Sequence, residues 1–386
     1  MRVMLYEPSG RGGMKHYTEG LADSLTGLGV DISVLTSTAQ AAPSNKHRVI
    51  TRLRDPGRKV SRVSWPFDRA LSGLYNSAVR AIEALSGYDI CHLQQVTPLF
   101  DWATLRIIHI PLVLTVHDVH PHEPRWWKSQ WFFHGVYTAV DHIIVHSLHN
   151  AKALVKHGHV DPAMVSVIPH GLDPIQGDLI PRVQARQQLG LPTDSPIALF
   201  FGSIRRDKGL DIALQAIAMA RNWHLVVAGA ANDLSLSTDL ARQLGIGGRV
   251  YWRIGFIPDE EVTTYFTAAD VVVLPYKPSF ESQSGVLFQA YRHHIPVVVT
   301  EVGSLGETVR EDGSGIVIPP DNPQALAKAL DEALPLGSRV PWRSLELKYS
   351  WENVAWLTLS VYRKVVGDVP SADAGTGTWQ RQHAKL

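Results

Sequence analysis

The sequence predicts an α/β protein of two domains, each with a parallel sheet covered by helices on both faces. The chain has 386 residues, more than one compact core usually holds. Short β-branched or aliphatic runs alternate with stretches of helical spacing. A succession of strand, glycine-rich turn and helix begins at Arg2 and begins again at Ile197. This repetition favours two domains of similar design.

The first domain is expected over residues 1–170. A helix is predicted over Met14–Leu28, where Leu21, Leu25 and Leu28 recur at helical spacing before Gly29 ends it. The apolar runs predicted as strands are Arg2–Tyr6, Val30–Thr36, Ile90–Leu93, Leu112–Val116, His142–Val145 and Val165–Ile168.

The second domain is expected over residues 171–350, with the junction inside the Pro- and Gly-containing stretch Pro169–Ser195. A helix is predicted from Leu210 to about Ala220, and Asn322-Pro323 is typical of a helix start. Residues 351–367 are expected to form a helix that packs back toward the first domain, and 368–386 a disordered tail. The predicted strands are Ile197–Phe201, Leu225–Val227, Val250–Arg253, Val271–Leu274, Val297–Thr300 and Ile316–Ile318.

The composition excludes several classes of protein. Lys and Arg number 37 against 36 Asp and Glu, so no global charge attracts nucleic acid. The single cysteine, Cys91, cannot form an internal disulfide and is interpreted as a packing residue.

No apolar run approaches the roughly 18 residues of a membrane span. Pro8 and Gly10 interrupt the N-terminus before a signal peptide could form. We expect a cytoplasmic protein, with peripheral contact at the inner face of the membrane left open.

Ligands of open parallel sheets bind beyond the carboxyl ends of the strands. The two halves are expected to face each other across a cleft lined by such loops. The first loop is Gly10–Gly13, where Gly12 and Gly13 allow an anion to approach a helix N-terminus. Lys15 breaks the G-x-G-x-x-G pattern of dinucleotide sites. A tight turn without a ligand is the alternative.

The second loop, Gly202–Gly209, places Arg205, Arg206 and Lys208 after a strand. Fixed cations there stabilise a leaving group, such as a diphosphate, that gains negative charge in the transition state. The alternative is a solvated basic loop.

The third candidate runs from Ser279 to Gln289. Ser282 or Ser284 can cap a helix, and Gly285 keeps its N-terminus open to an anion. Glu281 can accept hydrogen bonds from sugar hydroxyls, and the amide of Gln289 is expected to face the same cleft. The alternative is an ordinary capped helix.

The fourth candidate is Val116–Glu123, at the end of a strand. His117 and Asp118 are competent metal ligands, but no second ligand cluster follows at a recognisable spacing. We therefore expect His117 to form hydrogen bonds at the cleft and predict no metal site and no cofactor.

In order and spacing these pieces resemble the retaining family-4 glycosyltransferases of the GT-B fold, which has two Rossmann-like domains facing each other across a cleft. The resemblance runs from Met1 to about Val366. The pieces that carry it are Gly12-Gly13 with Leu21-Ala22 and Leu25, Val167-Ile168-Pro169-His170-Gly171, Lys208-Gly209, Ala269-Asp270-Val271 to Pro275, Ile295-Pro296-Val297-Val298, and Gly303 with Glu307.

The resemblance implies an acceptor-binding first domain and a second domain that binds a nucleotide-diphosphate sugar. Lys208 resembles the lysine that holds the donor diphosphate, Glu281 the glutamate that touches the donor sugar, and His117 the histidine near the reacting carbon. The resemblance also gives roles to two glycines that close over the phosphates, to amides that cradle the distal phosphate and to a segment that packs the base: Gly12 and Gly13, Ser284, Gly285 and Val286, and Arg253, Ile254 and Gly255 with Phe256.

This sequence departs from the family at two positions. Ser203 stands where the family usually has Arg, and Arg205 or Arg206 is the candidate replacement for that charge. Gln289 stands where the family usually has a second Glu that bonds the ribose hydroxyls, and an amide can make the same bonds.

The predicted activity is that of a retaining hexosyltransferase in polysaccharide or glycoconjugate biosynthesis. In the family, the acceptor attacks on the face that the diphosphate leaves, and the departing phosphate takes its proton. Two alternatives are a catalytically weak nucleotide-sugar-binding protein, suggested by Ser203 and Gln289, and a nucleotide-sugar epimerase. The broken G-x-G-x-x-G pattern disfavours a dehydrogenase.

Two segments suggest a lipid-linked acceptor or an anionic lipid surface. The stretch Lys46–Arg62 is strongly basic, with Arg48, Arg52, Arg54, Arg58 and Lys59 between its basic ends and only Asp55 opposing them. Arg125-Trp126-Trp127-Lys128 precedes Trp131-Phe132-Phe133 and joins cations to aromatic rings. A solvated loop and a helix face packed in the core are the respective alternatives.

Overall fold

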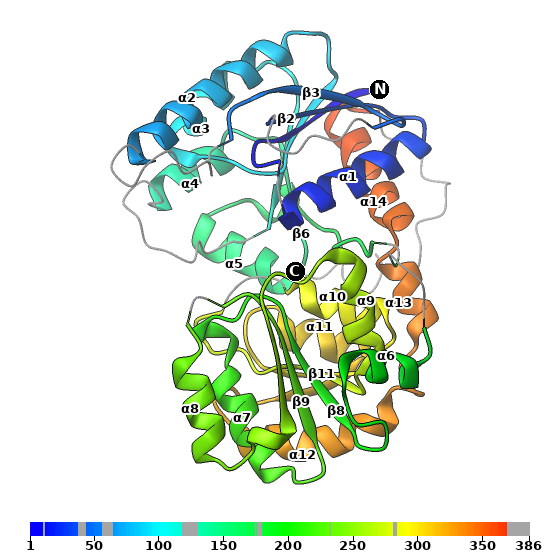
Figure 1. The fold of residues 1–386 in the computed structure, drawn as a ribbon. Coiled ribbons are helices and arrows are strands. Elements are labelled where there is room, and N and C mark those ends of the chain that lie inside the picture. Colours follow the sequence, from blue (N-terminus) through cyan, green and yellow to red (C-terminus); the bar gives the residue numbers. More distant parts are fainter. Residues whose placement is uncertain are drawn as a thin grey trace. The chain divides into compact units, whose positions relative to one another are not determined.

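The computed structural model describes residues 1–10, 12–37, 44–55, 65–117, 130–173, 175, 180–231, 233–280 and 284–368, with the backbone alone at 65–67, 69 and 130. The chain divides into two compact units. The first comprises Met1–Gly171 and the chain from Tyr349 onward, and the second comprises Leu172–Lys348. Both units are α/β (Figure 1).

The first unit holds a seven-stranded sheet in the order β3-β2-β1-β4-β5-β6-β7, with every neighbouring pair parallel. Its inner strands are buried on both faces, which explains their unbroken apolar runs. They are β1 (Arg2–Glu7), β2 (Asp31–Ser37), β3 (Arg48–Leu53), β4 (Ile90–Leu93), β5 (Leu112–Val116), β6 (His142–Val145) and β7 (Val165–Val167).

Helices cover both faces of this sheet. One face packs against α1 (Gly12–Gly27) and α14 (Trp351–Val365), which contact each other. Gly20 permits this approach, because a Cβ there would lie 2.3 Å from the Trp351 ring. The opposite face packs against the C-terminal end of α2 and against α4 and α5. The helices on that side are α2 (Trp65–Ala84), α3 (Pro98–Thr104), α4 (Gln130–Tyr137) and α5 (Leu148–Gly158).

The second unit holds a six-stranded parallel sheet in the order β10-β9-β8-β11-β12-β13. Its strands are β8 (Ile197–Phe201), β9 (His224–Gly229), β10 (Val250–Ile254), β11 (Val271–Leu274), β12 (Val297–Thr300) and β13 (Gly315–Ile318). Its helices are α6 (Arg182–Leu189), α7 (Leu210–Met219), α8 (Ser235–Gln243), α9 (Asp259–Ala268), α10 (Gly285–Arg292), α11 (Leu305–Asp312), α12 (Pro323–Ala333) and α13 (Trp342–Lys348).

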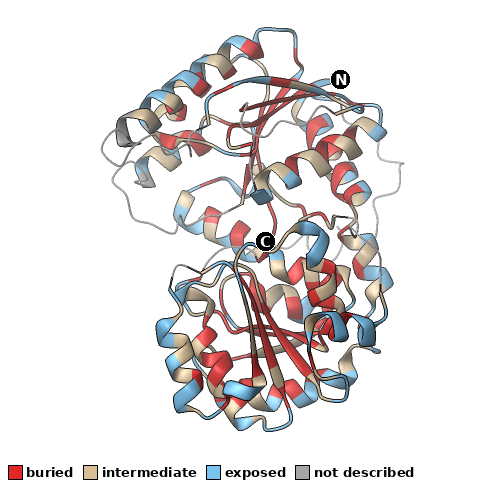
Figure 2. Ribbon diagram, in the orientation of Figure 1, coloured by how far each residue is buried: buried red, intermediate tan, exposed pale blue. Residues whose placement is uncertain are grey.

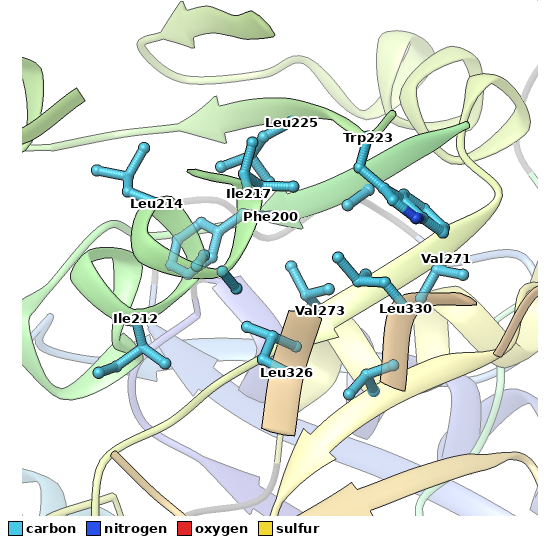
Figure 3. Packing of buried hydrophobic residues seen from close by; sticks show 14 of the residues in the cluster. Phe200, Ile212, Leu214, Ile217, Trp223, Leu225, Val271, Val273, Leu326 and Leu330 are labelled. Carbon is cyan, nitrogen blue, oxygen red and sulfur yellow. The ribbon is translucent and has the colours of Figure 1, made fainter. Parts of the chain in front are cut away.

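The core of the second unit lies between its sheet and α7 and α12. Leu214 and Ile217 of α7 and Leu330 of α12 cluster with Phe200 and Val273 of the sheet (Figure 3). In both units the strands are largely buried, whereas the helices expose their outer faces (Figure 2).

The predicted fold class, two α/β domains with parallel sheets, is confirmed. The helix start predicted at Asn322-Pro323 is also confirmed: α12 begins at Pro323, and Asn322 Oδ1 caps it by accepting the Ala325 N–H at 2.9 Å. Burial of Cys91 raises the pKa of its thiol to about 12, as expected of a packing residue. Within the described ranges, no helix is both long and apolar enough to cross a bilayer.

Strand β3 and helices α2, α3 and α5 of the first unit were not predicted. Part of the basic stretch Lys46–Arg62 forms β3, an edge strand in which Ile50 and Leu53 are buried while Arg48 and Arg52 are exposed. Charges on an edge strand prevent pairing with other chains, and they masked its apolar alternation. The following helix, α2, was also missed. Arg58 and Lys59 lie outside the described residues.

Candidate functional site

The strand order marks one place in the second sheet where a ligand is expected. β8 lies between β9 and β11, so the chain connections run in opposite directions from this point. Two loops leave the carboxyl ends of the strands here: residues 202–209 follow β8, and residues 275–280 with Ser284 follow β11. Of the residues predicted to bind phosphate, Lys208 and Ser284 lie in these two loops, and Gly285 and Val286 begin the helix that follows the second loop.

Lys208 of the first loop lies over aromatic rings of the second. Its Nζ is 3.7 Å from the centroid of the Tyr276 ring and 3.9 Å from that of Phe280. Both rings are buried. The hydroxyl of Tyr276 is in turn hydrogen-bonded to Ser284 Oγ at 2.9 Å. Lys208 and the turn before α10, predicted from separate motifs, are therefore joined through a single tyrosine.

A glycine and a backbone hydrogen bond hold the two loops together. Gly209 has a φ of +69°, and a Cβ there would lie 1.9 Å from the carbonyl oxygen of Pro275. Only glycine accommodates both the conformation and this approach. Lys277 N–H donates to Asp207 O at 2.9 Å. These contacts fix Lys208 relative to β11 without any contribution from its own side chain.

The surroundings of Lys208 lower the pKa of its amine into the neutral range. Burial, followed by repulsion from Arg205, lowers the pKa of its amine to about 7, while Asp207 opposes the shift. The Arg205 guanidinium donates to both oxygens of Asp207, at 3.0 and 2.8 Å. Arg206 lies in the same loop with its side chain exposed. An anion bound here would restore the full charge of Lys208.

The helix N-terminus after β11 differs from the prediction in one respect. Ser284 occupies the N-cap position of α10, but its Oγ bonds to Tyr276 and does not cap the helix. The expected cap by Ser284 is therefore wrong, and no side chain of the described residues caps α10. A Cβ at Gly285 would meet nothing within 4 Å, and Val286 approaches Gly202 of the first loop. This N-terminus thus keeps its backbone donors accessible to an anion.

The other predicted site residues that the structure describes in the second unit lie outside the contacts between Lys208, Tyr276 and Ser284. The Arg253 guanidinium donates to the carbonyls of Leu189 and Trp252, so it is engaged with the end of α6. Ile254 and Gly255 lie at the carboxyl end of β10, where Phe256 is 82% exposed. Gln289 is half-buried in α10, and its Oε1 accepts from Arg292 at 3.4 Å. Glu281 and Ser282 lie outside the described residues.

In the first unit the glycine loop is held by a buried carboxylate at the end of β1. Glu7 accepts hydrogen bonds from the Ser9 and Gly10 N–H groups at 2.9 and 2.7 Å and from Thr36 Oγ1 at 3.3 Å. Gly10 has a φ of +61° and packs against Ser37. Gly12 and Gly13, exposed in the first turn of α1, have open space where a Cβ would stand. Arg11 lies outside the described residues.

A cluster of aromatic and imidazole rings lies at the carboxyl ends of β5 to β7 of the same sheet. Tyr17 of α1 packs edge-on against His117 at 4.9 Å and against His146 at 5.1 Å. His170 lies 5.1 Å from the same tyrosine, and Trp351 of α14 lies 5.3 Å from it. Within the described ranges, no three His, Cys, Asp or Glu side chains are arranged to hold a metal ion.

His117, predicted at the end of β5, is linked to His146 at the end of β6. Its Nδ1 lies 3.1 Å from His146 Nε2. Burial lowers the pKa of His117 well below its ordinary value, and His146, His170 and His92 lower it further. His117 is therefore neutral at physiological pH.

Sequence reasoning missed four residues of these sites: Tyr276, Phe280, Glu7 and His146. Glu7, Tyr276 and His146 lie at or just after the carboxyl end of a strand, and Phe280 lies further along the loop after β11; this placement is the signal that could have drawn attention to them. Their packing partners come from distant parts of the sequence, so spacing along the chain did not connect them.

Comparison with known proteins assigns a family domain to each half. Residues 11–176 match the model described as Glycosyltransferase Family 4, and residues 182–339 match that described as Glycosyl transferases group 1. A D-inositol 3-phosphate glycosyltransferase of Corynebacterium aurimucosum is 27% identical over 84% of this chain and 83% of its own length. An uncharacterized glycosyltransferase of Methanocaldococcus jannaschii is 31% identical, but that match spans 52% of this chain and 54% of the relative.

Solved structures share the whole fold. HepE of Anabaena, in complex with UDP, has a TM-score of 0.75 at 18% identity, covering 94% of this chain and 100% of its own. Sucrose-phosphate synthase from Thermosynechococcus elongatus has a TM-score of 0.73 at 22% identity, covering 96% of this chain and 100% of its own. With a glycosyltransferase family domain in each half and two Rossmann-like domains of the GT-B type, the chain is a glycosyltransferase.

Proposed function

We propose that the chain transfers a hexose from a nucleotide-diphosphate sugar to a saccharide or lipid-linked acceptor, with retention of anomeric configuration. The observation that carries the proposal is the placement of Lys208 over Tyr276, which bonds to Ser284 at the start of α10, where no described side chain caps the helix. A half-buried ammonium and the backbone donors of a helix N-terminus suit a diphosphate, because both stabilise the charge that develops on it as the glycosidic bond breaks.

In this mechanism the acceptor oxygen forms a bond to the anomeric carbon on the face from which the diphosphate leaves. The bond between that carbon and the phosphate oxygen breaks, and the acceptor hydroxyl gives its proton to the departing phosphate. The chain contributes position and charge rather than a nucleophile. Lys208 and the amides of Ser284, Gly285 and Val286 bind the phosphates. His117 and Glu281 bind the sugar.

Names of related proteins support parts of this proposal. HepE has been solved with UDP and with UDP-glucose, which makes uridine nucleotides the first donors to test. Relatives named D-inositol 3-phosphate glycosyltransferase add phosphorylated polyols to the acceptor panel. Nucleotide sugars and phosphorylated polyols are both available to a cytoplasmic enzyme of polysaccharide or glycoconjugate biosynthesis.

A donor screen followed by product analysis tests the proposal. Thermal unfolding is measured with UDP-, GDP- and ADP-sugars, since a bound ligand raises the melting temperature by mass action. The stabilising donor is then incubated with an acceptor panel, and the anomeric configuration of the product is read by NMR. Product with the donor's configuration supports the proposal. Binding without turnover over a broad panel identifies the weak binding protein, and donor conversion without acceptor identifies the epimerase.

The exposed face of α2 favours contact with a lipid surface as part of this function. Leu71, Leu74, Ile82 and the adjacent Leu85 are 59%, 53%, 65% and 76% exposed. Arg52 of β3, whose side chain is 63% exposed, extends toward α2, where it pairs with Glu83. Apolar side chains beside basic ones match an anionic bilayer interface. Of the predicted aromatic segment, Trp131 is 65% exposed, whereas residues 125–128 lie outside the described ranges.

Vesicle co-sedimentation tests this contact. The protein should sediment with phosphatidylglycerol vesicles and less with phosphatidylcholine vesicles, and Leu71→Ser with Leu74→Ser should abolish the difference. Leu236→Ser is the control, because Leu236 of α8 is 72% exposed in the other unit. Equal sedimentation of the double variant and the control variant would remove the lipid contact from the proposal.

A further inference from the structure

Three polar groups in the first unit form a continuous line of hydrogen bonds. The carbonyl oxygen of Ile168, just after β7, lies 3.0 Å from His146 Nδ1. His146 Nε2 lies 3.1 Å from His117 Nδ1. His146 is only 6% exposed, so these bonds are shielded from water.

The direction of the line follows from the chemistry of its ends. A carbonyl oxygen only accepts, so His146 must carry its proton on Nδ1. A neutral imidazole has one N–H, which leaves His146 Nε2 as an acceptor. The hydrogen bond to His117 therefore requires a proton on His117 Nδ1. The remaining nitrogen of His117, Nε2, is then an acceptor as well.

Both rings are neutral, as this reasoning requires. Burial is the largest cause that lowers the pKa of His146 to about 3, and burial also lowers that of His117 far below its ordinary value. The other rings packed against the pair come from Tyr17 and His170. None of these neighbours is a carboxylate that would stabilise an imidazolium.

His117 Nε2 is the open end of the line. It is fully buried, and among the described residues it has no hydrogen-bond partner. A buried acceptor without a partner is uncommon in folded proteins and marks a place where a ligand donor completes the bond.

We propose that His146 is a positioning residue that holds His117 in the Nδ1-protonated tautomer, so that His117 Nε2 accepts a hydrogen bond from a hydroxyl group of the sugar substrate. The inference rests on the proposed function for the identity of the ligand. To that function it adds a role for His146, which touches no substrate, and a basis for choosing between sugars. An acceptor nitrogen favours a sugar with a hydroxyl at this point over a deoxy sugar, and it disfavours a carboxylate, which offers no proton.

The tautomer can be read directly by nitrogen NMR of the full chain labelled with 15N-histidine. Without ligand, His117 should show a pyridine-type Nε2 and a pyrrole-type Nδ1, and substitution His117→Gln assigns its signals. In the variant His146→Phe, which keeps a ring between Tyr17 and His170, the two His117 signals should move toward each other as both tautomers become populated. His142→Phe is the matched control, because His142 is a buried histidine of β6, the strand that ends just before His146, and it bonds to Ser166 instead.

Each outcome has a distinct meaning. A pyrrole-type Nε2 on His117 in the wild-type chain overturns the inference whether or not the variants fold. Unchanged His117 signals in His146→Phe overturn the role of His146. Addition of UDP-glucose, with UDP as the comparison, should shift Nε2 only when the sugar is present. If the tautomer is fixed but the Nε2 signal shifts with no nucleotide sugar or acceptor saccharide tested, the line of hydrogen bonds stands. That result would contradict the proposed function of His117.

Discussion

The Nζ atom of Lys208 lies 3.7 Å from the ring centroid of Tyr276, whose hydroxyl is bound to Ser284. This contact connects the loop after β8 with the helix start after β11, two segments separated by about seventy residues in the sequence. The aromatic faces stabilise the ammonium only partly, since burial removes much of its hydration. The result is a cation that is held in place and lacks a full counter-charge until an anion binds.

The first prediction concerns the charge of Lys208. Lys208→Met should lower turnover at least about a hundredfold, the typical loss when one preorganised donor to a developing anion is removed. The melting temperature should stay unchanged or rise, because a poorly solvated ammonium is replaced by an apolar chain of similar length. Steady-state kinetics and thermal unfolding measure the two effects.

Lys277→Met is the matched control for that substitution. Lys277 lies in the neighbouring loop, but its Nζ pairs with Asp211 at 2.7 Å and is partly solvated. Its loss should leave turnover within a few-fold of wild type. Equal losses in both variants would mean that Lys208 contributes general positive charge and has no specific place at the phosphates.

The second prediction is a proton uptake on donor binding. The pKa of Lys208 is lowered from 10.5 to about 7 without ligand, and a bound diphosphate should raise it. Affinity for the donor should therefore be constant below pH 7 and fall by up to about tenfold per pH unit above it. Calorimetry in buffers of different ionisation enthalpy measures the uptake directly. Lys208→Met should abolish both effects, and a wild-type affinity that is flat from pH 6 to 9 would contradict the prediction.

The same shift has a stability consequence of defined sign. Between pH 7 and 10.5 the unfolded chain holds a proton on Lys208 that the folded chain has lost. Stability contributed by this group should therefore rise with pH across that window. Comparing denaturation of wild type and Lys208→Met at several pH values isolates this contribution.

The third prediction concerns the start of α10. Gly285→Ala adds a methyl group where the protein itself leaves open space, so the melting temperature should change little. Binding of a nucleoside diphosphate should weaken about tenfold or more, because the methyl group keeps the phosphate from the helix N-terminus and one charge-assisted bond is lost. Isothermal titration measures this change. Gly13→Ala, at the start of α1, is the comparison: it also has room for a methyl group, and its effect should fall on turnover more than on nucleotide binding.

Much of the fold could be predicted because its strands are buried on both faces and therefore appear as unbroken apolar runs, as in Val271–Leu274 and Val297–Thr300. β3 was missed because an edge strand tolerates the charges of Arg48 and Arg52, which hid the pattern. At the site, Lys208 was identifiable from its place after a strand. The rings of Tyr276 and Phe280 around it were not, since packing between separate loops leaves no local signal.

The side-chain bond of Ser284 illustrates the same limit. Its position before α10 predicted a helix cap, and the residue does occupy the N-cap position. A serine hydroxyl has several partners within reach, and here Tyr276, eight residues earlier, competes with the helix backbone. The sequence can predict which residue occupies an N-cap position. It can predict the capping hydrogen bond only when no tertiary partner competes for the side chain.

The last prediction concerns Glu7, which closes the glycine loop of the first unit. Its two carboxylate oxygens accept from the Ser9 and Gly10 N–H groups, and Ser9 and Thr36 contribute hydroxyl donors. Glu7→Gln replaces one of these oxygens with an NH2 group that faces a backbone donor, so at least one bond is lost. We expect the free energy of unfolding to fall by about 1–3 kcal/mol, the cost of an unsatisfied buried donor.

Chemical denaturation measures this loss, with Glu19→Gln as the control. Glu19 of α1 lies 3.7 Å from Lys15 at the surface, where an ion pair contributes little. Because the glycine loop leads directly into Gly12 and Gly13, Glu7→Gln should also raise KM for the substrate bound there, whereas Glu19→Gln should not. A Glu7→Gln variant with wild-type stability and KM would show that the loop keeps its conformation without the carboxylate, and Gly10 with its φ of +61° would then be the sole determinant of the turn.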